Sequence, residues 1–153
     1  MREAIDVVYP FAGESLCNCT AVRQAARHMQ RFYDACLAET GLRGTQYTIL
    51  LYLSRQQSLT VNALAEALVM DRTTVGHAVK PLERDGLIAI DVDPADRRSR
   101  LISLTPQGAA RVQDGFNAWR KAQRLFEEKF GSDKAKDMRR TMAEVVQTDL
   151  DPS

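Results

Sequence analysis

Cysteine and histidine are scarce in this chain of 153 residues, which contains three cysteines and two histidines. Cys17 and Cys19 are separated by one residue, and His28 and His77 fall in different predicted helices, so no zinc-ligand spacing occurs. An odd cysteine count without a regular framework argues against a disulfide scaffold and favours reduced thiols in a reducing compartment. We therefore expect no metal and no cofactor.

Long apolar runs are missing as well. No run of about 18 apolar residues is present, as a transmembrane helix would need. The first residues, "MREAIDVVYPFAGESL", carry acidic side chains and a proline where a secretory signal needs an uninterrupted apolar core. With 44% hydrophobic and 27% charged residues, the composition is typical of a globular protein, so we expect a cytoplasmic protein without a membrane partner.

A strong net charge is also absent, because the formal charge is +1. The whole chain therefore exerts no general attraction on polyanions, and contacts with nucleic acid must depend on local charge placement. Catalytic constellations are not recognisable either, since the predicted helices offer no nucleophile beside a base and no paired carboxylates. We expect that the protein is not an enzyme.

Hydrophobic periodicity predicts a chain of helices. Apolar residues at steps of three and four predict one long amphipathic helix over residues 15–40, and "YTILLYL" predicts a mostly buried helix over residues 45–55. Thr105 followed by Pro106 is a good N-cap and first turn for a helix that reaches Gly131. A last helix is predicted over residues 132–148.

The stretch between residues 60 and 86 predicts a helix-turn-helix. Thr60 and Asp71 are expected to cap two short helices that meet across "VMD", and Gly86 is expected to end the second helix in a left-handed conformation. Pro81 lacks an N–H group, so we expect a bend or a distorted last turn in the second helix.

Two alternating segments follow, "LIAIDV" and "RLISL", and they flank the charged loop "DPADRRS". This pattern predicts a β-hairpin with a polar tip. The predicted fold is therefore mostly α with a small β-hairpin wing, in the element order of a winged helix-turn-helix.

In that architecture the second helix of the motif enters the DNA major groove with its first residues toward the base edges. Arg72 can bond a guanine edge, and Thr73 and Thr74 can reach phosphate or a thymine methyl. The alternative interpretation is that these residues form a solvated helix face without DNA contacts. The candidate DNA contacts on this helix are Arg72, Thr73, Thr74, His77 and Lys80.

The hairpin tip is expected over the adjacent minor groove, whose negative potential favours an inserted arginine. Arg98 is the candidate probe, and Asp96 is expected to hold its guanidinium by a bidentate pair. Arg97 and Arg100 are candidates for phosphate contacts or for solvated charge. Residues 71–100 contain six basic and six acidic side chains, so their placement must supply the positive field.

"LAEALVMDRTTVGHAVKPLERDGLI" followed by "DPADRRSRLISLTPQG" resembles the multiple antibiotic resistance regulator (MarR) family, and Asp96-x-Arg98 before "LISLTPQG" is the specific part. The resemblance implies a homodimer with an N-terminal dimerisation helix (15–40), a winged helix-turn-helix DNA-binding domain (44–104) and C-terminal dimerisation helices (105–150). Two winged lobes would read a pseudo-palindrome in double-stranded DNA. The terminal helices also carry more apolar residues than one small domain can bury, which favours a partner surface. These residues are Phe116, Trp119, Phe126 and Phe130.

The resemblance further implies a repressor, less often an activator, that is relieved by a small ligand or by cysteine oxidation. The family often binds aromatic carboxylates or phenolic compounds where the dimer helices meet the winged lobe. An arginine there would pair a ligand carboxylate and aromatic side chains would form the walls, although each residue taken singly also fits a core, interface or ion-pair role. The candidates are Arg23, Arg27, His28, Tyr33, Tyr47 and Trp119.

Redox sensing is the alternative. Cys19 lies 28 residues before Tyr47, which is the spacing of the reactive cysteine in the organic hydroperoxide sensors of the MarR family, and Tyr33 matches one of their tyrosines. Arg23 and Gly44 occupy the places of the other two, and a Cys17–Cys19 pair within one helix would point its thiols apart. Inert thiols, or a winged helix that binds protein rather than DNA, are the remaining alternatives.

Overall fold

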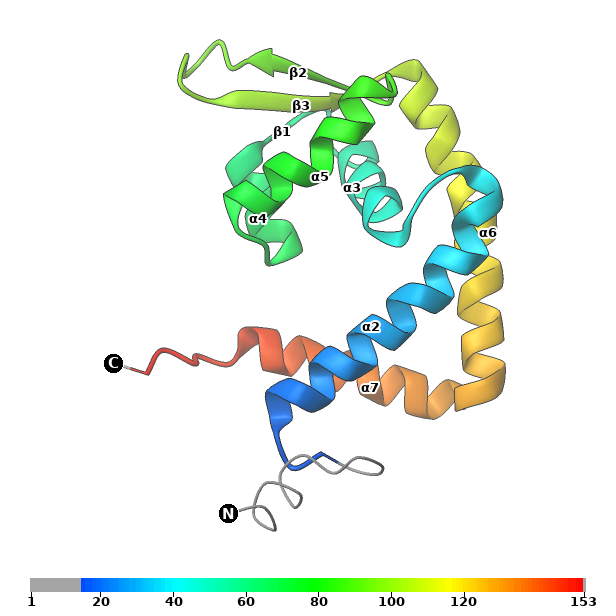
Figure 1. Cartoon of the computed structure of the whole chain (residues 1–153). Coiled ribbons are helices and arrows are strands. Elements are labelled where there is room, and N and C mark those ends of the chain that lie inside the picture. The colour runs from blue at the N-terminus through cyan, green and yellow to red at the C-terminus, as the bar shows by residue number, and fades with distance from the viewer. Residues whose placement is uncertain (1–14, 153) are drawn as a thin grey trace.

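The computed structural model describes residues 15–152, where helices surround one small antiparallel sheet (Figure 1). Most of the N-terminal stretch "MREAIDVVYPFAGESL" falls in residues 1–14, outside the described part. No helix in the described part is long and apolar enough to cross a membrane. The elements are α2 (Asn18–Leu37), the 3-10 helix η1 (Ala38–Thr40), α3 (Gly44–Ser54), β1 (Leu59–Thr60), α4 (Val61–Leu68), α5 (Arg72–Arg84), β2 (Ile88–Val92), β3 (Arg100–Leu104), α6 (Pro106–Phe130) and α7 (Ser132–Gln147).

The winged lobe consists of α3, α4 and α5 packed with a three-stranded sheet in the order β1-β3-β2. The predicted hairpin is β2 and β3, which pair from Ile88 opposite Leu104 to Val92 opposite Arg100. Sequence analysis missed the third strand, in which Leu59 pairs with Ile102. Two residues are too few to show an alternating pattern.

The core lies under this sheet, where α3 is the central helix. Its residues Ile49, Leu50 and Leu53 are at most 1% exposed, which confirms the predicted burial, although Tyr52 is 38% exposed. From the other elements of the lobe, the fully buried side chains are Leu64, Val75, Leu82 and Ile102. The helix α5 and the hairpin of β2 and β3 are therefore fixed to one rigid base.

Local capping bonds set where the helices begin. The Thr60 hydroxyl oxygen accepts a hydrogen bond from the Ala63 N–H (3.0 Å), and the Thr105 hydroxyl oxygen accepts one from the Gly108 N–H (3.0 Å). Gly86 has a φ of +72°, as expected for the residue that ends α5. These predicted caps are confirmed, and α5 continues through Pro81 to Arg84, so the proline does not end the helix.

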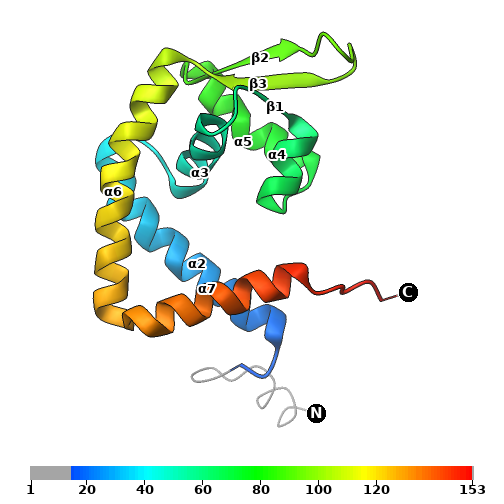
Figure 2. The ribbon, with the colours of Figure 1, turned by 180° about the vertical axis from the view of Figure 1, so that it is seen from behind.

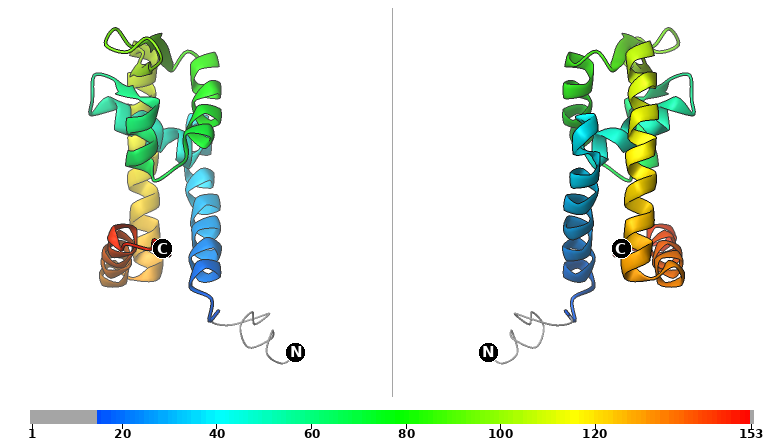
Figure 3. Two further views of the ribbon diagram at one scale, coloured as in Figure 1. Left: turned by 90° about the vertical axis from the view of Figure 1, so that its left-hand side faces the viewer. Right: turned by 90° about the vertical axis from the view of Figure 1, so that its right-hand side faces the viewer.

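α2 and α7 lie on the far side of α3 from the wing, and α6 runs from the end of β3 down to them (Figure 1). α2 packs along α6, and α7 follows α6 after a sharp turn at Gly131, which has a φ of +101° (Figures 1 and 2). Although α2 and α7 overlap in those two views, Figure 3 shows them on opposite sides of α6. α2 begins at Asn18 rather than at residue 15 and passes into η1 after Leu37, so the single predicted helix over 15–40 is shorter.

Candidate functional site

The outer face of α5 carries all the side chains predicted for its DNA contacts, and all of them are exposed; these are Arg72, Thr73, Thr74, His77 and Lys80. The opposite face, with Val75, Val79 and Leu82, is buried in the lobe. The polar side chains therefore project from a helix whose position is fixed by its apolar face.

Asp71 fixes the first turn of α5. Its carboxylate accepts hydrogen bonds from the Thr74 N–H (2.8 Å) and from the Thr74 hydroxyl (2.6 Å). These bonds, the hydroxyl bond first, lower the pKa of Asp71 because they favour the ionised carboxylate. The Thr74 hydroxyl therefore donates its proton to Asp71 within the helix cap.

The wing tip, residues 93–99, is held by short-range hydrogen bonds. The Ser99 N–H donates to the Asp96 carbonyl (2.8 Å), and the Arg98 N–H donates to the Asp96 carboxylate (3.0 Å). The predicted clamp is therefore wrong in its partner, since no ion pair joins the Asp96 and Arg98 side chains in the described residues. A carboxylate two residues before an N–H group closes a local turn more readily than it reaches a long side chain. Asp96 therefore shapes the tip, and the Arg98 guanidinium is left exposed.

A hollow of about 630 Å³ lies between the start of α5 and the wing. It brings together Arg72 and Thr73 from the helix with Arg98 from the wing, as predicted from the sequence. His77, Lys80 and Arg97 lie outside its lining. The residues that line it are Val61, Asn62, Arg72, Thr73, Asp96, Arg98, Ser99 and Arg100.

Asn62 is a polar residue of this hollow that sequence analysis missed. It is exposed in the first turn of α4, and a polar residue two positions after the Thr60 cap was the available signal. Three arginines face a single aspartate around the hollow, so the local charge is positive although residues 71–100 sum to zero. Placement supplies the positive field.

A second cavity, of about 420 Å³, lies where the long helices meet the winged lobe. We call it the junction cavity. It brings together three of the six predicted ligand-pocket residues, Tyr33, Tyr47 and Trp119. Its lining comprises Ala26, Met29, Gln30, Tyr33, Leu37, Gly44, Thr45, Tyr47, Thr48, Leu68, Met70 and Trp119.

The other three predicted pocket residues are not in the junction cavity. Arg23 and Arg27 are exposed, and His28 lines a separate apolar cavity with Phe126 and Phe130. The lining residues of α2 recur at steps of three and four from Ala26 to Leu37, which leaves the two arginines outside. The expectation that an arginine of α2 pairs a ligand carboxylate in this cavity is therefore wrong.

The two tyrosines of the junction cavity are in different states. The Tyr33 hydroxyl donates to the Gln123 side-chain oxygen, whereas the Tyr47 hydroxyl is the one buried side-chain polar atom in residues 15–152 without a hydrogen-bond partner. Burial raises the pKa of both tyrosines. The Tyr47 ring lies against Gly115, where an added Cβ would come within 2.7 Å of Cε2. Tyr47, a lining residue of this cavity, thus carries an unused and buried hydrogen-bond donor.

The cysteines differ from expectation in one respect. Cys17 is the N-cap of α2, with extended backbone (φ −86°, ψ 110°), and only Cys19 lies inside the helix, where it is exposed. The assumption that both thiols belong to one helix is therefore wrong. Within residues 15–152, no three His, Cys, Asp or Glu side chains gather as metal ligands.

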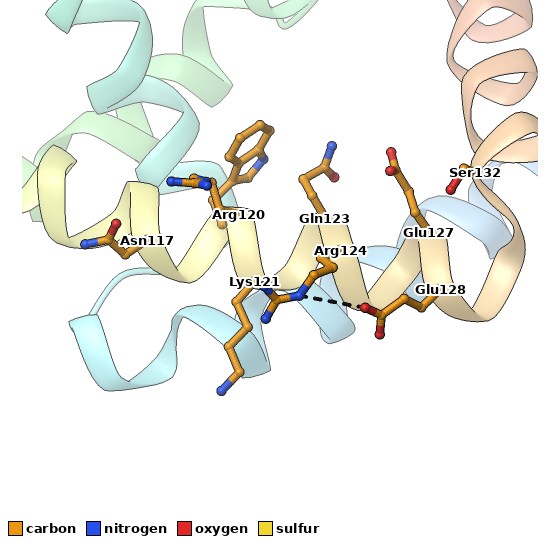
Figure 4. Close-up of a pocket in the computed structure, with 9 residues that line it drawn as sticks. Asn117, Arg120, Lys121, Gln123, Arg124, Glu127, Glu128 and Ser132 are labelled. Carbon is orange, nitrogen blue, oxygen red and sulfur yellow. Dashed lines mark ion pairs between the residues drawn. The ribbon is translucent and has the colours of Figure 1, made fainter.

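A polar hollow of about 550 Å³ runs along the second half of α6 (Figure 4). Gln123 and Glu127 point to one side of the helix in this view, and Lys121, Arg124 and Glu128 point to the other. Arg124 pairs with Glu128 (3.7 Å), and Glu127 pairs with Arg139 of α7 (3.0 Å). Because these side chains diverge, they do not form a convergent site.

Comparison with known proteins identifies the family. The MarR family model matches residues 40–99, most of the winged lobe. The structure of the M. tuberculosis transcriptional regulator MosR in complex with DNA is 30% identical, covers 86% of this chain and 99% of that chain, and has a TM-score of 0.73. The chain belongs to the MarR family. Members of the MarR family are transcriptional regulators and not enzymes.

Two further comparisons support the MarR fold. An organic hydroperoxide resistance transcriptional regulator of Bacillus subtilis is 35% identical over 91 residues, which are 60% of this chain. The chain spans about three fifths (62%) of that regulator's length. Bordetella bronchiseptica BpsR, whose DNA binding is regulated by 6-hydroxynicotinic acid, is 21% identical, covers 90% of this chain and 99% of its own, and has a TM-score of 0.78.

Proposed function

We propose that this MarR-family chain is a homodimeric repressor that binds a pseudo-palindromic operator in double-stranded DNA and is released by a small aromatic or phenolic ligand. The observation that carries the DNA-binding part is the hollow that joins Arg72 and Thr73 of α5 to Arg98 of the wing. The MosR structure in complex with DNA supports the same function.

The DNA contacts follow from this geometry. The first turn of α5 would enter the major groove, where Arg72 bonds a guanine edge and Thr73 a phosphate or a thymine methyl. Arg98 would enter the adjacent minor groove, and Asn62 would bond the phosphate between them. Arg97, Arg100, His77 and Lys80 are proposed as phosphate contacts around this centre.

The homodimer is proposed from apolar side chains that one protomer leaves open. Phe116 and Phe130 are 39% and 44% exposed, and Val145 and Val146 of α7 are exposed as well. These residues lie on the long helices rather than on the winged lobe. A second copy would bury them and place two recognition helices in successive major grooves.

The effector is proposed to bind in the junction cavity. Tyr33 and Trp119 supply aromatic walls, and the unpartnered Tyr47 hydroxyl can donate a hydrogen bond to a ligand oxygen. Since Arg23 and Arg27 lie outside the cavity, the ligand needs an acceptor oxygen and does not need a full carboxylate. Regulation of BpsR by a hydroxylated aromatic acid is a parallel within this fold.

Thiol-based redox sensing through Cys19, with Cys17 as a second thiol, is the alternative proposal. It is favoured by the exposure of Cys19 in the first turn of α2, where the thiol is open to a peroxide. The similarity to an organic hydroperoxide resistance regulator points the same way. Treatment of the DNA complex with cumene hydroperoxide separates the two proposals, because only the thiol mechanism predicts release that Cys19→Ser abolishes.

In vitro selection tests DNA binding directly. The purified full chain is incubated with a pool of random 30-base-pair duplexes, and the bound duplexes are amplified and sequenced over several rounds. We expect enrichment of an inverted repeat with half-sites about one helical turn apart. Enrichment of no sequence would contradict the proposal and favour a protein-binding winged helix.

A further inference from the structure

The turn of the helix-turn-helix holds a strained residue. Val69, which directly follows α4, has φ 52° and ψ 46°, and it is the one non-glycine residue in residues 15–152 with a positive φ. Left-handed backbone is unfavourable for a side chain branched at Cβ, and glycine or asparagine normally occupies such a helix end. The Val69 side chain is 70% exposed, so its own packing does not stabilise this conformation.

The neighbours of Val69 hold it in place. The Val69 N–H donates to the Glu66 carbonyl (3.1 Å), and the Met70 N–H donates to the Ala65 carbonyl (2.9 Å). The Leu68 and Met70 side chains, on either side of Val69, pack against the core and line the junction cavity.

The recognition helix begins immediately after this turn. Asp71 lies two residues after Val69 and caps α5 by accepting hydrogen bonds from Thr74. Arg72 and Thr73 follow, and both line the hollow between α5 and the wing. A change of backbone conformation at Val69 would therefore redirect the first turn of α5, because nothing but Met70 separates the strained residue from the cap.

We propose that Val69 is a positioning residue that couples the junction cavity to the recognition helix. Packing of Leu68 and Met70 holds Val69 left-handed and α5 in its DNA-binding position. When a ligand displaces these side chains, Val69 relaxes to negative φ and α5 turns away from the operator. This inference rests on the proposed DNA-binding function and adds the route by which the cavity controls it.

A double-mutant cycle tests the coupling without an identified effector. Met70→Ala removes one of the two side chains that hold the turn, and Val69→Gly removes the strain. DNA affinity is measured by fluorescence anisotropy on the duplex that the wild-type protein enriches from the random pool. Val69→Ala is the matched control, since alanine keeps the Cβ that disfavours left-handed backbone.

We expect Met70→Ala to weaken DNA binding roughly five- to thirtyfold in the wild-type and Val69→Ala backgrounds, which corresponds to the usual cost of left-handed backbone. In the Val69→Gly background the same change should alter affinity by less than about twofold. Equal losses in all three backgrounds would overturn the inference.

Ala26→Phe provides a second arm in case Met70→Ala unfolds the lobe. Ala26 is exposed and lines the junction cavity from α2, so phenylalanine there fills the cavity without removing core packing. We expect weaker DNA binding in the wild-type background and little change in the Val69→Gly background, and equal effects in both would overturn the inference. Failure of the wild-type protein to enrich any duplex would instead contradict the proposed function itself.

Discussion

At the scale of single residues, Tyr47 is the most informative side chain of the junction. It is 2% exposed, its ring packs in the core, and its hydroxyl bonds no described protein group. A buried hydroxyl without a partner costs stability, and a ligand oxygen that accepted its hydrogen bond would remove that cost.

Tyr47→Phe tests this interpretation. Because it removes an unsatisfied polar atom, we expect the free energy of unfolding, measured by urea denaturation, to stay equal or rise by about 1 kcal/mol. We also expect a phenolic acid such as 4-hydroxybenzoate to raise the melting temperature of the wild type and to leave that of Tyr47→Phe unchanged. A fall of more than about 1 kcal/mol would show that the hydroxyl has a stabilising partner.

The raised pKa values of Tyr33 and Tyr47 predict the response to alkali. As the pH rises above about 10, the unfolded chain releases these phenol protons before the folded chain does. The free energy of unfolding is therefore constant with respect to these groups below about pH 10 and falls above it. Urea denaturation between about pH 9 and 11 should show this fall, with a shallower slope in Tyr47→Phe. Identical slopes would contradict a raised pKa of Tyr47.

At the scale of elements, α6 joins the long helices to the winged lobe through Gly115. This glycine is buried, and an added Cβ would overlap the Tyr47 ring. The close approach of α6 to α3 therefore depends on the absence of a side chain at this position.

Gly115→Ala should lower the free energy of unfolding by about 1–3 kcal/mol, the usual cost of overpacking a core. Gly76→Ala is the matched control, since a Cβ at Gly76 in α5 meets nothing within 4 Å. Alanine there should be neutral or stabilising by up to about 1 kcal/mol, because alanine favours helix over glycine. Equal effects in urea denaturation of the two variants would contradict the packing.

Local patterns were sufficient for much of the fold. Thr60, Asp71 and Thr105 were correctly predicted as helix caps, and each accepts a hydrogen bond from the N–H group three residues later. Such contacts are predictable because both partners lie within one turn of the chain. The hairpin was predicted from its alternation, whereas the two-residue β1 has none. The order of these elements predicted a winged helix-turn-helix before the resemblance to the MarR family was considered.

Contacts between side chains were harder to predict. Asp96 has two possible partners within two residues, and spacing does not say that it bonds the Arg98 N–H rather than the guanidinium. Whether Arg23 and Arg27 enter the junction cavity depends on how α6, which is distant in sequence, packs against α2. The left-handed Val69 gave no signal, because valine is unusual at such a position.

At the scale of the whole molecule, a single chain leaves apolar side chains of its long helices exposed. Figure 3 shows α2 and α7 on opposite sides of α6, and exposed phenylalanine, methionine and valine side chains lie on α6 and α7. Burial of this apolar surface by a second copy is the physical basis for the proposed homodimer.

Phe130→Glu should convert the dimer into a monomer at micromolar concentration, because it places a charge on the apolar surface that the second copy would cover. Sedimentation velocity measures the mass. Val92→Glu is the control, since Val92 is also half exposed but lies on the wing, and this variant should stay dimeric. A wild-type monomer, or a dimer in both variants, would contradict this surface as the interface.

The central claim is that α5 and the wing together bind DNA, and its most direct test is the salt dependence of binding by Arg98→Ala. Affinity for the enriched duplex is measured by anisotropy at several salt concentrations for the wild type, Arg98→Ala and Arg124→Ala. Arg124 is an exposed arginine of α6 that lies outside the proposed DNA-binding surface of α5 and the wing. We expect wild-type affinity to fall steeply with salt. Arg98→Ala should bind more weakly with a slope smaller by about 1, and Arg124→Ala should match the wild type. Arg98→Ala curves that superimpose on those of the wild type would contradict the claim.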